Sequence, residues 1–86
     1  LSARTQLAAQ GASLDRSLAA ARRAEQLYEV RYRAGAVPLR TWLDAQEARR
    51  NAEIAQAQNM LERLSNQVAI YEALGGDLAG TSRPAS

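Results

Sequence analysis

The sequence contains no cysteine, histidine, lysine or phenylalanine. Because cysteine is absent, the chain can form no disulfide and no thiolate metal site, which is compatible with any cellular compartment. Because histidine is absent, the chain lacks the residue that most often serves as a general base or binds a catalytic metal. There is also no apolar run of about 18 residues, so no segment is predicted to cross a membrane as a helix.

The acidic side chains do not make up for the missing catalytic types. The six glutamates are spread mostly over the outer faces of the predicted helices and do not converge on one site. The glycine pair Gly75-Gly76 follows a predicted helix instead of leading into one, so it is not a phosphate-binding loop. We predict that the chain is not an enzyme, with no catalytic residues, no cofactor and no metal site.

The charge balance argues against a nucleic-acid partner. The chain has eleven arginines and nine acidic residues, which gives a net charge of only +2. The opposite charges are interleaved along the predicted helices and do not gather into one basic patch. We therefore expect no binding of nucleic acid.

The residues that are abundant favour helix. Alanine, leucine, glutamine, glutamate and arginine dominate, and the only prolines are Pro38 and Pro84. The pattern predicts an all-α fold in which residues 1–76 form an antiparallel two-helix coiled-coil hairpin. Its predicted parts are a helix over 2–33, a turn over 34–38 and a helix over 38–74.

The predicted helix ends depend on glycine and proline. Gly35 can adopt the left-handed conformation that ends a helix, and Pro38 suits the first turn of the next one. Gly75-Gly76 is expected to end the second helix. Residues 77–86 are then expected to form a flexible C-terminal tail.

The apolar residues of both predicted helices recur at helical spacing. The two stripes are Leu7, Leu14, Leu18, Ala21, Tyr28 and Tyr32, and Leu43, Ile54, Ala57, Leu61, Leu64, Val68 and Tyr71. When the chain folds about the turn, the stripes advance at the same rate, as an antiparallel coiled coil requires. The predicted pairs are Tyr28 with Leu43, Ala21 with Arg50, Leu18 with Ile54, Leu14 with Ala57, Gly11 with Leu61, and Leu7 with Leu64. Gly11 would make room for Leu61.

A second stripe on the second helix consists of small residues. It contains Ala45, Ala48, Ala52 and Ala55, on the side away from Ile54 and Leu61. Small residues let another helix come close, so this helix could be sandwiched within a wall of helices. Alanine also favours helix on a solvated face, and the composition does not choose between these two interpretations.

A few polar and aromatic residues interrupt these stripes. Glu25, Glu47 and Arg50 should form a polar layer that fixes the register. Trp42 lies off the predicted seam, as a contact for a neighbouring helix or as an exposed anchor. For Tyr28 and Tyr32 we favour packing beside the turn over a ligand-binding aromatic pair.

Four short motifs occur in order along the chain. They are Tyr32-Arg-Ala-Gly35, Leu43-Asp44-Ala45-Gln46, Ala52-Glu53 and Ile70-Tyr71-Glu-Ala-Leu74-Gly75-Gly76. Through this combination, residues 24–76 resemble the C-terminal helical repeat of the TolC-like outer-membrane factor family of efflux proteins. The resemblance implies a trimeric channel of a Gram-negative outer membrane with a periplasmic α-barrel, of which this hairpin would be one periplasmic piece.

The resemblance also implies partners and site residues. The parent homotrimer would work with a membrane-fusion adaptor and an inner-membrane pump in a tripartite export system. Gly35, Ala36 and Val37 would dock the adaptor at the hairpin tip. Asp44 would contribute to the entrance constriction, although it could simply complement the helix dipole. Tyr32 would make a closed-state contact, but Val37 replaces the arginine that accompanies this tyrosine in well-known relatives.

Two alternatives remain open. The first is the coiled-coil hairpin of a membrane-fusion adaptor, and the second is a cytoplasmic helical dimerisation module.

A two-helix unit of this size buries little apolar surface. We therefore expect the isolated chain to self-associate, for instance as two hairpins in a four-helix bundle.

Overall fold

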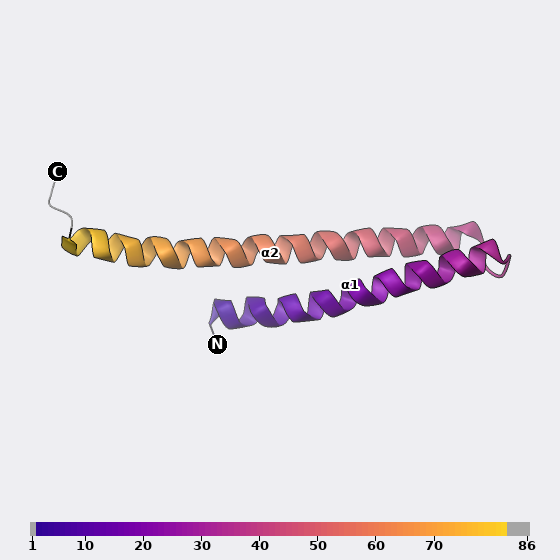
Figure 1. The fold of residues 1–86 in the computed structure, drawn as a ribbon, viewed down its shortest axis with the longest axis horizontal. Helices are drawn as coiled ribbons and strands as arrows, with labels where there is room; N and C mark the ends of the chain where they lie inside the picture. The colour runs from indigo at the N-terminus through magenta and orange to yellow at the C-terminus, as the bar shows by residue number, and fades with distance from the viewer. Residues whose placement is uncertain (1, 83–86) are drawn as a thin grey trace.

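The computed structural model describes the backbone of residues 2–82 and the side chains of residues 2–76. It contains two helices, α1 (Ala3–Arg33) and α2 (Leu39–Ser82). They run antiparallel and are joined by a short turn, as Figure 1 shows. The hairpin measures 73 × 27 × 13 Å, so it is a long, flat unit. The predicted all-α helical hairpin is confirmed.

The ends of α1 and the start of α2 lie within one residue of the predicted boundaries. Ser2 caps α1 because its hydroxyl accepts a hydrogen bond from the backbone N–H of Thr5 at 3.2 Å. Pro38 precedes α2 and does not belong to its first turn. The Pro38 carbonyl accepts a hydrogen bond from the Thr41 N–H at 3.1 Å.

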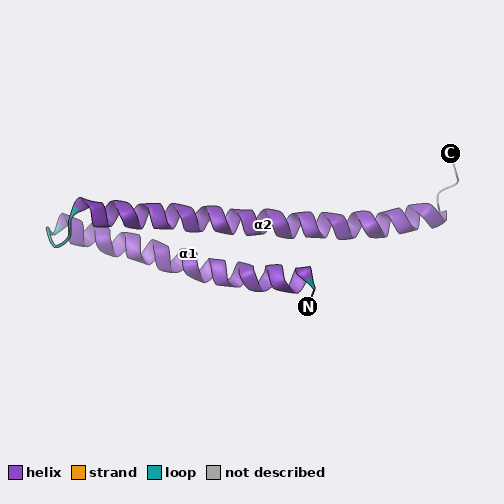
Figure 2. Ribbon diagram, turned by 180° about the vertical axis from the view of Figure 1, so that it is seen from behind, coloured by secondary structure: helices purple, strands orange, loops and turns teal. Residues whose placement is uncertain are grey.

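The far end of α2 differs from the prediction. The helix continues through Gly75-Gly76 to Ser82, so its predicted end near Leu74 was wrong. A glycine that ends a helix usually adopts a positive φ, and among the described residues only Gly35 does so. Residues 83–86 of the predicted tail lie outside the described residues. Beyond the start of α1, α2 projects alone, which is clear from both sides of the molecule (Figures 1 and 2).

The helices meet through the predicted face of α1 but through a different face of α2. Leu18 of α1 is 2% exposed, whereas Ile54 and Leu61 of α2 are 55% and 64% exposed. The face of α2 that packs on α1 instead carries Ala45 and Asn59, which are 8% and 3% exposed. The predicted contacts of α1 with Ile54 and Leu61 were therefore wrong. The remaining residues of the predicted α2 stripe (Leu43, Ala57, Leu64, Val68 and Tyr71) are exposed as well.

The reason for this difference is that α2 carries two heptad series on nearly opposite sides. The series facing α1 is made of Trp42, Ala45, Arg49, Ala52, Gln56, Asn59 and Asn66, all of them buried or half-buried. Its small residues fit against the larger residues of α1, and this allows close approach. Of the predicted alanine stripe, Ala45 and Ala52 thus belong to the contact within the hairpin, whereas Ala48 is exposed.

The core of this hairpin is small. Leu18 and Ala45 are the buried apolar side chains in the described part of the chain, and Asn59 is the buried polar one. Many large apolar residues remain on the surface. A hairpin with so little burial gains limited stability from its own contacts.

Candidate functional site

The hairpin tip is held in shape by backbone hydrogen bonds. Gly35 has φ +77°. Its N–H donates to the Tyr32 carbonyl at 2.9 Å, and the Ala36 N–H donates to the Arg31 carbonyl at 2.8 Å. This pair of bonds is the Schellman arrangement, which satisfies the last carbonyls of a helix. The backbone of the tip is therefore held in a defined shape, and the N–H groups of Gly35 and Ala36 are both engaged within the turn.

The surface of the tip is small and apolar. Gly35 and Ala36 are exposed and Val37 is half-buried. Arginines lie close by, since Arg31 and Arg33 belong to the last turn of α1. None of the three tip residues has a side chain that can donate or accept a hydrogen bond. The tip can therefore offer shape and apolar contact, but it cannot perform chemistry.

Tyr32 is engaged inside the hairpin. Its ring and that of Trp42 have centroids 5.4 Å apart and planes inclined at 31°. Both residues are half-buried. Trp42 was predicted to lie off the seam, but its ring packs on Tyr32 of α1 across the seam. This pair joins the end of α1 to the start of α2 and stiffens the tip.

Asp44 is exposed and does not contact α1. Its carboxylate lies 3.3 Å from Nε of Arg40, one turn earlier in α2, and both side chains are well exposed. The first turn of α2 contains no acidic residue. A role for Asp44 at the helix dipole is therefore weak, because the effect fades beyond the first turn. The side chain is accessible to solvent or to a neighbouring molecule.

A charged cluster crosses the hairpin near its middle. Arg49 of α2 forms ion pairs with Glu25 of α1 and with Glu53 of its own helix. The hydrogen bonds that Arg49 donates to Glu25 and, second in effect, to Glu53 raise the pKa of Arg49 above its usual value. Of the predicted polar layer only Glu25 takes part in this cluster, because its partner is Arg49 and both Glu47 and Arg50 are exposed. The predicted composition of the layer was therefore wrong.

A buried amide fixes the register further from the tip. Asn59 Nδ2 donates to the Leu7 carbonyl at 3.1 Å and to Oε1 of Gln10 at 3.2 Å. A Cβ atom added to Gly11 would lie 2.8 Å from Asn59 Oδ1. Gly11 thus makes room for Asn59 and not, as predicted, for Leu61. The close approach was predicted correctly and its partner was not.

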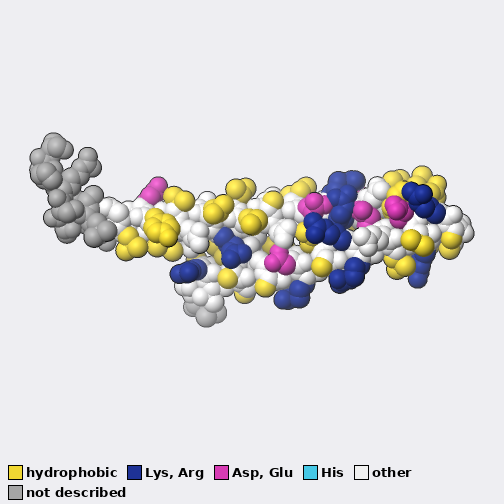
Figure 3. Space-filling model, viewed as in Figure 1, with side chains coloured by type: hydrophobic (Ala, Val, Ile, Leu, Met, Phe, Trp, Pro, Cys, Tyr) yellow, Lys and Arg dark blue, Asp and Glu magenta, His cyan; other side chains and the backbone are white. Residues whose placement is uncertain are grey.

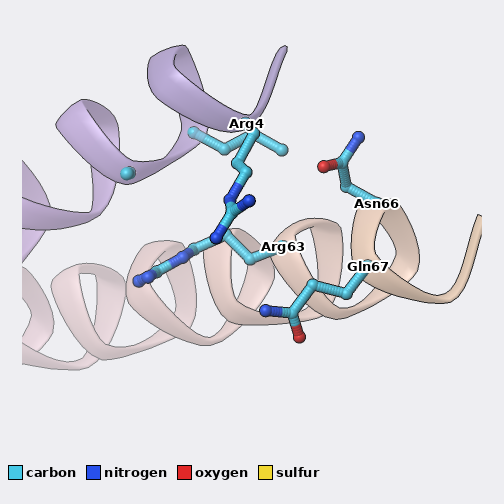
Figure 4. A pocket seen from close by; sticks show the side chains of 6 residues that line it. Arg4, Arg63, Asn66 and Gln67 are labelled. Atoms are coloured by element: carbon cyan, nitrogen blue, oxygen red, sulfur yellow. The ribbon is translucent and has the colours of Figure 1, made fainter. Parts of the chain in front are cut away.

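One hollow lies where α1 begins. A shallow groove of about 210 Å³ is lined by Arg4, Leu7, Ala8, Arg63, Asn66 and Gln67. Figure 4 shows Arg4 reaching from α1 toward Arg63 on α2. No acidic or nucleophilic side chain lines this groove.

Two further kinds of arrangement, a metal-binding cluster and a membrane-spanning helix, are both absent from the residues that the structure describes. Across residues 2–82 there is no cluster of three or more side chains that could hold a metal ion. In the same part of the chain, neither helix has a stretch long and apolar enough to span a bilayer.

Sequence reasoning missed Arg49, Asn59 and the contact made by Trp42. All three belong to the heptad series of α2 that contains Ala45 and Ala52. Only Ala45 and Ala52 of that series were part of the predicted stripe of small residues. The prediction used the more apolar stripe instead, because apolar periodicity usually marks the buried face of a helix.

One comparison with known proteins gives a match. Over 62 residues the chain is 47% identical to the pyoverdine export outer membrane protein OpmQ of Pseudomonas putida. The match takes in 72% of this chain but only 13% of that protein. No protein-family model matches the chain. No solved structure matches it either. The chain is thus similar to one segment of an outer-membrane export protein.

Proposed function

We propose that the chain is a periplasmic hairpin of an outer-membrane efflux channel of the TolC-like outer-membrane factor family. The observation that carries this is the 47% identity over 62 residues to an outer-membrane export protein. The elongated two-helix shape suits a tunnel wall built from hairpins standing side by side. That relative is an export protein by name and not an enzyme, in keeping with a non-catalytic role.

In this proposal the tip of the hairpin is a docking point. Gly35 and Ala36 are exposed, and the backbone around them is held by hydrogen bonds within the turn. A preformed small surface binds a partner with little loss of conformational entropy. The partner would be the hairpin of a membrane-fusion adaptor that bridges to an inner-membrane pump. Shape and apolar contact would supply the affinity, because the tip side chains have no polar groups.

Asp44 would belong to the entrance constriction. Its side chain is exposed, so in a homotrimer three copies could face a common axis. A ring of carboxylates favours cations over anions. Arg40, which pairs with Asp44 at 3.3 Å, would weaken such a ring by partly neutralising it.

Tyr32 would contribute to the closed state from beside the tip. Trp42 holds its ring within the hairpin, so a hydroxyl contact with a neighbouring hairpin would come from a prepositioned side chain. Val37 cannot act as the cationic partner of this tyrosine. Any closed-state contact of Tyr32 would therefore use a different group.

Other parts of the assembly would select the cargo and supply the energy for export. The relative exports pyoverdine according to its name, whereas the groove at the start of α1 in this hairpin is shallow and open to solvent. We propose a passive conduit, opened by shifts between neighbouring hairpins when the adaptor binds the tip. The inner-membrane pump would supply the energy.

Docking at the tip can be tested by site-specific photo-crosslinking in the full-length parent protein. A photo-reactive residue replacing Ala36 should crosslink to the adaptor in intact cells. The same residue replacing Gln58, an exposed position about 30 Å along α2 from the tip, should not. Equal crosslinking from both positions, or none from Ala36, would refute docking at the tip.

A further inference from the structure

Three positions on the side of α2 toward α1 recur every seven residues, and they carry Arg49, Gln56 and Arg63. The first two contact an acidic residue of α1. Arg49 forms an ion pair with Glu25, and the side-chain amide of Gln56 donates a hydrogen bond to Asp15. A spacing of seven residues returns to nearly the same side of a helix. By this pattern, Arg63 should also meet an acidic residue of α1.

Arg63 differs from Arg49 in both of its neighbours. Across the seam, Arg4 of α1 reaches toward Arg63, as Figure 4 shows, so a second cation lies where an acid is expected. Within α2, Arg49 pairs with Glu53, four residues later. The residue four positions after Arg63 is instead the neutral Gln67. Neither Arg4 nor Arg63 forms an ion pair with any residue that the structure describes.

The groove between these two arginines is lined by groups that can donate hydrogen bonds. Asn66 and Gln67 contribute side-chain amides, and no described acidic side chain lines the groove. Gly11 makes room for Arg63, since a Cβ on this glycine would lie 3.1 Å from Nη1 of Arg63. Figure 3 shows acidic and basic side chains side by side toward the middle and the tip of the hairpin, and basic side chains near the start of α1. The groove therefore carries two positive charges that no described residue neutralises.

Two guanidinium groups that approach each other repel, and an anion between them removes the repulsion. A carboxylate or phosphate also accepts charge-assisted hydrogen bonds from the planar fork of an arginine. We infer that this groove is a binding site for a small oxyanion, a carboxylate or a phosphate, held between Arg4 and Arg63. The bound oxyanion does for Arg63 what Glu25 and Glu53 do for Arg49. This inference rests on the charges of the chain and does not depend on the proposed function.

The affinity of this site should be modest. Arg4 and Arg63 are both exposed, so water and salt screen their attraction for an anion. A dissociation constant on the order of 1 mM is expected. The site should still prefer oxyanions to chloride, because a carboxylate or phosphate can accept two parallel hydrogen bonds from one guanidinium group.

An NMR titration of the arginine Nε–Hε signals tests binding directly. Sodium phosphate, and in a second titration sodium acetate, replaces sodium chloride at constant ionic strength. The signals of Arg4 and Arg63 should shift saturably with one dissociation constant. The signal of Arg16, an exposed arginine about 18 Å along α1 from Arg4, should not.

The two anions distinguish the possible ligands. Saturation with both anions would support a site for which a single carboxylate is enough. Saturation with phosphate alone would support a site for a phosphate group. Saturation with neither, or equal shifts of the Arg16 signal, would overturn the inference.

A substitution that supplies the missing acid tests the role of the two arginines. Arg4→Glu should raise the dissociation constant for phosphate about tenfold or more, because its carboxylate would occupy the place of the anion beside Arg63. Arg16→Glu is the matched control, since it makes the same change of charge at another exposed arginine of α1. It should change the dissociation constant by less than about twofold at about 0.15 M salt, where distant charges are screened. Equal weakening by both substitutions would show a general attraction to positive charge and would overturn the inference.

Discussion

At the scale of single residues, two glycines show how far local chemistry can be read from a sequence. Gly35 was predicted to end a helix, and its φ of +77° confirms this. That prediction needed only the neighbouring residues, because helix ends obey local rules. Gly11 was predicted to allow close helix contact, which it does, but its partner is Asn59. The identity of a partner depends on which faces of two helices meet, and local chemistry does not determine that.

The close contact at Gly11 gives a stability prediction. Alanine normally raises the stability of a helix by about 1 kcal/mol relative to glycine. Gly11→Ala should instead lower the melting temperature, because the new Cβ would lie 2.8 Å from Asn59 Oδ1. Asn59 is buried and holds two hydrogen bonds, so moving it is costly. Thermal unfolding followed by circular dichroism measures the effect.

Gly75→Ala is the control for that experiment. No atom lies within 4 Å of a Cβ added there, and the residue is within α2. It should raise the free energy of unfolding by up to about 1 kcal/mol. If both substitutions stabilise the hairpin equally, Gly11 is not a site of close helix contact.

At the scale of elements, α2 explains why the fold class was predictable and the packing was not. The helices and turn follow from residue propensities and from Gly35, so they were predicted nearly to the residue at three of four ends. The fourth end failed because Gly75-Gly76 lies within the helix. The prediction of the packing face was wrong because α2 has two heptad series. The series with the larger apolar residues, including Leu61 and Leu64, faces outward.

The turn between the elements provides a second prediction. A Cβ on Gly35 would meet nothing within 4 Å, so any cost of replacing this glycine is conformational. Gly35→Ala should destabilise the hairpin by about 1 kcal/mol, because a left-handed backbone is unfavourable for alanine. Gly35→Asn should cost less, since asparagine tolerates this conformation. Equal melting temperatures for these two variants would show that the positive φ is not required.

At the scale of the whole molecule, the candidate site could be predicted only through resemblance. Composition and spacing excluded common catalytic types and gave Gly35 and Tyr32 only structural roles, while the adaptor-docking, constriction and closed-state roles of Gly35, Asp44 and Tyr32 came from the resemblance. The geometry adds the packing of Tyr32 on Trp42 and the ion pair of Asp44 with Arg40. The roles themselves concern contacts with other chains, and a single hairpin does not contain those contacts.

The role proposed for Asp44 can be measured in the full-length channel. Asp44→Asn should lower the preference for cations in planar-bilayer recordings, because each subunit loses one carboxylate at the constriction. Arg40→Gln should have the opposite effect, since it removes the cation that pairs with Asp44. If neither substitution changes the selectivity, Asp44 does not line the conduction path.

The central claim is that this hairpin belongs to an outer-membrane export channel. The most direct measurement is an immunoblot of fractionated source cells with an antibody raised against the chain. We predict a band several times larger than 9.3 kDa in the outer-membrane fraction. A soluble cytoplasmic band near 9.3 kDa would contradict the claim and would favour a helical dimerisation module.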